Sequence, residues 1–87
     1  MDLTYEVVWR RKRGTRILDS GVLAEFDNPP AALRMIRSLR ARGARAVLFE
    51  LGVELRETQH ILFVAREHDG DVVSVLDAWA LRPPPAA

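Results

Sequence analysis

The sequence predicts a small α+β protein: an antiparallel sheet of about five strands in the order β-β-α-β-β-β, with one helix packed on one face. Several stretches alternate apolar and polar residues with the period of two that is typical of half-buried strands. One stretch opens with a helix-capping signature. The chain has 87 residues, 48% of them hydrophobic, which is enough for one modest core. We expect a single domain over residues 1–82 and a Pro/Ala-rich tail over 83–87.

The first two strands are predicted at Leu3–Arg10 and Arg16–Phe26. The first carries β-branched and aromatic residues at alternate positions, which favours a strand with one buried face. Gly14 lies between the two segments and suits a tight turn, because glycine adopts positive φ without steric cost. Alternation breaks near Ser20 and Gly21, where a bulge or bend is expected.

A helix is predicted from Pro29 to Arg42. Asn28 can cap its first turn, and proline in that turn forfeits no helical hydrogen bond. Gly43 suits the position that ends a helix. The apolar residues fall on one stripe, as in a helix docked on a sheet.

Three further strands are predicted after the helix. Ala46–Arg56 alternates cleanly, and His60–Glu67 follows a short connection. Asp69–Gly70 is a strong hairpin-turn signal. The last segment starts at Val72; we favour a strand through Asp77, while residues 74–82 fit either a strand or a helix.

The second face of the sheet is the most informative feature for function. A helix of 14 residues is about 21 Å long and covers one face of a few strands. The opposite face would still carry apolar side chains, and such a patch usually marks an interface. We therefore expect a homodimer that packs through this face, unless the register is off by one or the tail folds back over it. The predicted self-association face consists of Val8, Leu48, Leu62, Val64, Val72 and Leu76.

The charges divide the chain into a basic and an acidic half. Residues 1–45 hold ten basic and five acidic side chains, whereas residues 46–87 hold three and seven. Unpaired arginines suit phosphate binding, because the guanidinium offers a fork of donors. The same arginines would also be explained by a solvent-exposed charged face, by a coding bias or by pairing with a neighbouring subunit. The alternative hypothesis of nucleic-acid binding rests on a hairpin loop and a helix ridge formed by Arg10, Arg11, Lys12, Arg13, Arg34, Arg37 and Arg40.

Catalysis has weaker support in the sequence. The chain contains no cysteine, and it has no glycine-rich phosphate loop, dinucleotide fingerprint or zinc-protease histidine pair. His60 and His68 would be about 26 Å apart along an extended strand, too far to share a metal. We predict no catalytic residue, no metal site and no cofactor. A small enzyme or ligand-binding protein with a pocket at the dimer seam, lined by Trp79, His60 and Leu62, stays a second alternative.

Together these observations predict a non-enzymatic interaction or binding module that self-associates through a sheet face. The longest apolar run, Ile61–Ala65, is far short of a membrane span, and the N-terminus does not resemble a secretory signal. We expect a cytoplasmic protein; size and composition are typical of small bacterial accessory proteins. The expected partners are a second copy of the chain and possible further proteins, with nucleic acid as the alternative and no membrane.

Overall fold

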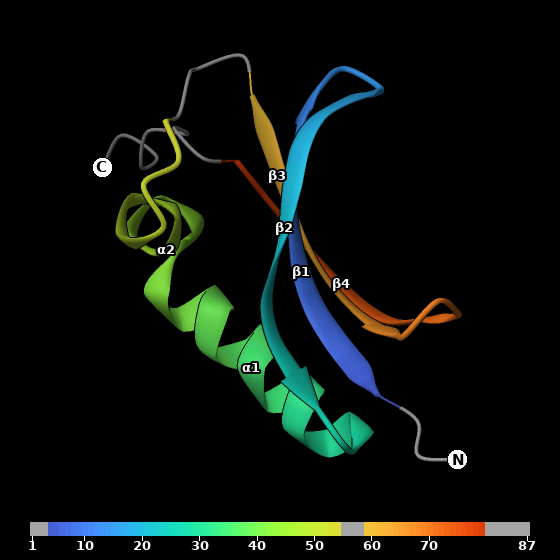
Figure 1. The fold of residues 1–87 in the computed structure, drawn as a ribbon. Coiled ribbons are helices and arrows are strands. Elements are labelled where there is room, and N and C mark those ends of the chain that lie inside the picture. The colour runs from blue at the N-terminus through green and yellow to red at the C-terminus, as the bar shows by residue number, and fades with distance from the viewer. Residues whose placement is uncertain (1–3, 55–58, 80–87) are drawn as a thin grey trace.

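The computed structural model describes residues 4–54 and 59–79. In that part of the chain the elements are β1 (Tyr5–Arg13), β2 (Arg16–Phe26), α1 (Pro29–Arg42), α2 (Ala44–Glu50), β3 (His60–Glu67) and β4 (Val72–Trp79). The strands form one antiparallel sheet in the order β2-β1-β3-β4. Both helices lie on one side of this twisted sheet (Figure 1). The predicted α+β class is confirmed, with four described strands instead of five and a second helix.

The prediction of a strand at 46–56 is wrong for residues 46–54; residues 55 and 56 lie outside the described part. Residues 44–50 form α2, and the chain turns at Leu51 and Gly52, where Gly52 has φ 70°. The buried residues of α2 are Ala44, Val47 and Leu48, which follow the spacing i, i+3 and i+4 of a helix face. Two adjacent buried residues do not fit a strand with one buried face, because neighbouring side chains point to opposite sides.

Helix α1 has the predicted bounds. The Asn28 side-chain oxygen accepts a hydrogen bond of 2.9 Å from the Ala31 amide, and prolines occupy the first two helical positions. At the other end, Gly43 adopts φ 85° and its amide donates to the Leu39 carbonyl over 2.9 Å. Local chemistry at both ends therefore sets the length of this helix.

The strand bounds agree with the prediction except in β1. That strand was predicted over Leu3–Arg10, but in the described residues it spans Tyr5–Arg13, so the predicted basic loop at Arg10–Arg13 belongs to the strand. Strands β2 and β3 have the predicted bounds, and β4 is a strand through Trp79. In the β1–β2 pair, register shifts at the Val7/Val8 and Arg11/Lys12 steps leave Leu23 and Leu18 as extra residues of β2, so the irregularity expected near residues 20–21 occurs on either side of them. At the β3–β4 turn, Asp69 adopts φ 58°, which confirms the hairpin. Residues 80–87, which include the predicted tail, lie outside the described part.

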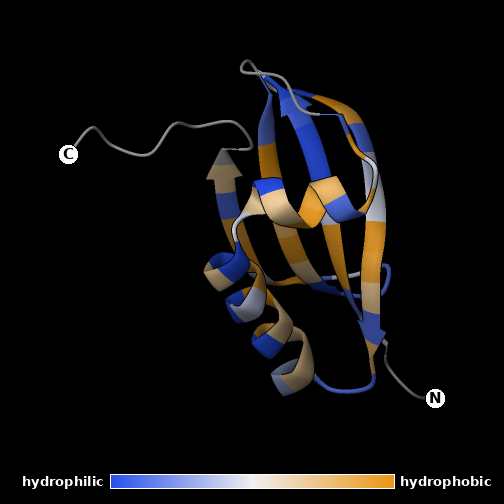
Figure 2. Ribbon diagram, turned by 90° about the vertical axis from the view of Figure 1, so that its left-hand side faces the viewer, coloured by the Kyte–Doolittle hydropathy of each residue, from blue (hydrophilic) through white to orange (hydrophobic). Residues whose placement is uncertain are grey.

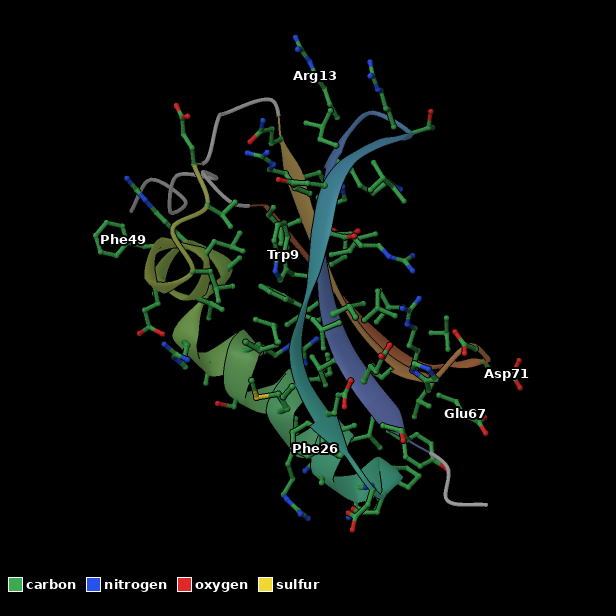
Figure 3. All side chains as sticks on the ribbon, in the orientation of Figure 1. Trp9, Arg13, Phe26, Phe49, Glu67 and Asp71 are labelled. Atoms are coloured by element: carbon green, nitrogen blue, oxygen red, sulfur yellow. The ribbon has the colours of Figure 1, made fainter. Side chains whose placement is uncertain are left out.

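The core lies between the sheet and the two helices. Figure 2 shows the hydrophobic middle of the strands behind helices that carry hydrophilic residues on their outer turns. Trp9 points from β1 toward the helices, whereas Phe49 points outward from α2 (Figure 3). Within the described ranges, neither helix is long and apolar enough to cross a membrane. The largest fully buried side chains in this core are Val7, Leu39, Leu48, Ile61 and Phe63.

Candidate interaction surfaces

The open face of the sheet, on the side away from both helices, carries a row of four valines. Register pairs Val8 of β1 with Val22 of β2 and with Val64 of β3, and Val64 with Val75 of β4. The valine row therefore crosses all four strands at one level. Its outer members are half-exposed, with Val22 at 53% and Val75 at 52%, whereas the inner two are each 3% exposed. The inner valines therefore add little exposed apolar surface to the row.

The predicted self-association face is only partly assembled. Val8 and Val64 lie on the open face, Leu62 is half-buried there, and Val72 is 59% exposed near the end of β4. Leu48 and Leu76 were assigned wrongly: both are buried in the core on the helix side. The apolar part of the open face is therefore smaller than the sequence predicts, and its exposed surface comes mainly from the edge strands.

Irregular pairing in the β3–β4 hairpin explains the wrong assignment of Leu76. Ala65 pairs with Ser74 whereas Arg66 pairs with Val72, so Val73 is an extra residue in β4. An extra residue reverses the alternation of faces beyond it. Val72 and Leu76 therefore point to opposite faces despite their even spacing. The sequence contains no separate signal for this bulge.

A buried carboxylate occupies the open face beside the valine row. Glu6 is 4% exposed; its two carboxylate oxygens lie 3.2 Å from Arg66 Nε and 2.9 Å from His68 Nδ1. The hydrogen bond to His68 and the positive charges around the carboxylate hold the pKa of Glu6 below its ordinary value, although burial opposes this. The same hydrogen bond and the nearby Asp69 carboxylate raise the pKa of His68. The spacing of these residues in the sequence did not predict this cluster.

The residues proposed for a seam pocket lie at the other end of the open face. Register pairs His60 with Trp79 and Leu62 with Asp77, and the His60 imidazole contacts the Asp77 carboxylate. The side chain of Trp79 lies outside the described part. Within the described part, no group of three or more histidine, aspartate or glutamate side chains is arranged to hold a metal ion.

The tip of the β1–β2 hairpin is basic. Arg13 and Arg16 are exposed and lie directly opposite each other, and Figure 3 shows Arg13 pointing away from the sheet. Arg11 is not available to a ligand: its Nε and Nη2 donate to the two Asp19 oxygens at 2.8 and 2.7 Å, and its Nη1 donates to the Glu54 carbonyl at 2.6 Å. Arg10 and Lys12 pair in register with Leu62 and His60, which puts them on the open face.

The helix arginines form a separate surface. Arg34, Arg37 and Arg40 are exposed on α1, on the other side of the sheet from Arg10 and Lys12. Arg37 and Arg40 line a cavity of about 200 Å³ between α1 and the middle of β4. Arg10 and Lys12 of the predicted polyanion site therefore lie on the opposite side of the sheet from Arg34, Arg37 and Arg40.

No family model, curated protein or solved structure matches this chain.

Proposed function

We propose that this protein is a non-enzymatic interaction module that self-associates through the open face of its sheet. The valine row carries the proposal: four β-branched side chains lie at one level across four strands, and its outer members, Val22 and Val75, are half-exposed. Exposed apolar rows flanked by polar residues are typical of protein interfaces. The rows on either side contain both positive and negative groups, among them Arg10, Asp77 and the Glu6 cluster, which would fix the orientation of a second copy.

The area of the face predicts a weak dimer. Four strands at about 4.8 Å spacing and eight residues at about 3.3 Å give a face of roughly 19 by 26 Å, or about 500 Å² per copy. Such an area lies near the lower end for specific interfaces. With the inner valines already shielded from water, we expect association in the micromolar range rather than an obligate dimer.

Sedimentation velocity over 1–500 µM protein would test this proposal. The wild-type chain should shift from 9.8 kDa toward twice that mass as concentration rises. Val22→Lys and Val75→Lys each place a charge on a half-exposed end of the row and should keep the chain monomeric throughout. Phe49→Lys is the matched control, because Phe49 is 82% exposed on α2, away from the sheet. A wild-type monomer at every concentration would refute the proposal, as would valine variants that associate like the control.

We propose polyanion binding at the hairpin tip as the second candidate function. Directly opposed like charges destabilise a strand pair, and the pairing of Arg13 with Arg16 would gain from a bound anion between them. The near-neutral net charge of +1 limits the expected strength. Phosphate contacts would make such binding independent of base sequence and sensitive to salt.

Retention on heparin and mobility shift of a mixed RNA pool at 50 mM salt would test the second candidate. The double variant Arg13→Ala/Arg16→Ala should lose binding, whereas Arg37→Ala/Arg40→Ala, with the same charge change on the helix side, should keep it. Equal loss in both variants would point to diffuse electrostatic attraction and would refute a site at the hairpin tip.

A further inference from the structure

A groove runs between α1 and the outer strand β4 on the helix side of the sheet. Its wall on α1 contains apolar and basic side chains, and its other wall is the middle of β4. The cavity in this groove has a volume of about 200 Å³. It is lined by Leu33, Ile36, Arg37 and Arg40 of α1 and by Ser74, Val75 and Leu76 of β4.

The backbone of β4 is available along this groove. Strand β4 is the last strand in the order β2-β1-β3-β4, so no described strand pairs with its outer side. Val73 and Val75 of this strand are 37% and 52% exposed. An uncovered edge strand presents a row of backbone donors and acceptors that can pair with an added strand.

The positive charge of the groove indicates which kind of partner it binds. Arg37 and Arg40 are exposed, and neither forms an ion pair with any residue in the described ranges. A second copy that paired through β4 would bring the same arginines of both copies toward one seam, which like charges disfavour. An acidic segment would instead supply a carboxylate for each guanidinium.

We propose that β4 and α1 form a docking groove for an extended acidic peptide, which adds to the sheet as a fifth strand beside β4. Side chains on one face of the added strand recur about every 6.8 Å. Arg37 and Arg40 are three residues apart on α1, so their Cβ atoms are about 5–6 Å apart. Acidic residues at alternate positions of the peptide therefore face the two arginines, and the intervening β-branched residues extend the valine row beyond Val75. The recognised chemistry is an alternation of acidic and β-branched residues in an extended strand.

Fluorescence anisotropy with a labelled peptide of five alternating glutamate and valine residues tests this proposal. The wild-type protein should bind it, and Arg37→Glu/Arg40→Glu should weaken binding at least tenfold. The double variant should in turn prefer a peptide in which lysine replaces glutamate. Arg34→Glu/Arg45→Glu is the matched control, because it makes the same charge change at exposed helix positions that do not line the cavity; it should alter the affinity by less than about threefold. Circular dichroism checks that each variant is folded.

Strand addition is tested separately on the wild-type protein with peptides methylated on alternate backbone nitrogens. In one of these peptides the methyl groups replace the N–H donors that face β4, and this peptide should bind at least tenfold more weakly. The peptide methylated on the other set of nitrogens should bind like the parent peptide. Equal binding of the two methylated peptides would overturn strand addition, and equal weakening by the groove variant and its matched control would overturn the groove. Absence of binding at millimolar peptide would overturn the proposal as a whole. Val22→Lys, which disrupts the proposed dimer face, should leave peptide binding unchanged, so the two proposals can fail independently.

Discussion

Gly21→Ala is expected to destabilise the protein through a collision with Trp9. Gly21 lies on β2 directly opposite Trp9 of β1. A Cβ atom at position 21 would lie 2.6 Å from the indole Nε1 of Trp9 and 3.0 Å from its Cε2. The indole is 8% exposed, and its neighbour on the other side is Phe63 of β3, which is fully buried. The ring therefore has little room to move aside.

The expected cost follows from two opposing effects. Forcing extra volume into a packed core costs about 1–3 kcal/mol. Replacing glycine by alanine within a strand returns about 0.5–1 kcal/mol, because the unfolded chain has fewer conformations to lose. The net loss in the free energy of unfolding should be about 1–2 kcal/mol. For a domain of this size, this corresponds to a fall in Tm of roughly 5–15 °C.

Chemical denaturation followed by circular dichroism measures this loss, and a double-mutant cycle assigns its cause. Trp9→Leu alone should be destabilising because it removes buried ring atoms. In that background Gly21→Ala should be neutral or slightly stabilising, since the ring it would strike is absent. The cycle should therefore show about 1.5–2.5 kcal/mol of coupling between the two positions. Zero coupling, or a Gly21→Ala variant as stable as the wild type, would refute the packing argument.

Three further predictions test other parts of the fold. Leu48→Ala should lower the free energy of unfolding by about 2–5 kcal/mol in chemical denaturation, whereas Phe49→Ala should lower it little. The reason is that Leu48 is fully buried and Phe49 is 82% exposed. The opposite order would indicate a strand at these residues and not α2. Asn28→Ala should lower the free energy of unfolding by about 0.5–2 kcal/mol, because the helix loses its cap. Asn28→Ser, which keeps a capping side chain, is the conservative control. Equal stability of the wild type and both variants would contradict this prediction. The ion pair of Glu6 with His68 should stabilise the fold most between pH 4.5 and pH 6.5, which are the ordinary pKa values of the two groups. Because folding lowers the pKa of Glu6, this stability is lost as pH falls below that range. Because folding raises the pKa of His68, the stability is also lost as pH rises through the raised pKa. Tm should therefore fall from pH 6 to pH 8.5 in the wild type and change less in His68→Gln; identical pH profiles would exclude this pair as the cause.

Local signals predicted much of the architecture. The bounds of α1 follow from Asn28, two prolines and Gly43, whose effects act within one turn of helix. The hairpin at Asp69–Gly70 likewise depends on a residue that tolerates positive φ. Strands β2 and β3 were predictable because half-buried strands carry their own period of two. These elements depend on neighbours in sequence and need no knowledge of the rest of the chain.

The segment 44–50 was not predictable in this way. Its apolar residues satisfy a strand pattern and a helix pattern at the same time, and short apolar runs carry no length signal to separate them. Burial of Ala44, Val47 and Leu48 against the rest of the core decides in favour of the helix. The competing pattern failed because it would have left Leu48 on the open face and Phe49 in the core.

The sequence alone determined the α+β class, the single α1 helix with both of its ends, most strand bounds and the uneven distribution of charge along the chain. Only the tertiary structure decided which side chains share a face. One extra residue in β4 moved Leu76 into the core. The placement of α1 on one side of the sheet separated Arg37 and Arg40 from Arg10 and Lys12 and set them beside the outer strand β4. The physical reason is that register and helix docking depend on contacts between residues far apart in the chain, whereas caps and turns depend on residues within a few positions of one another.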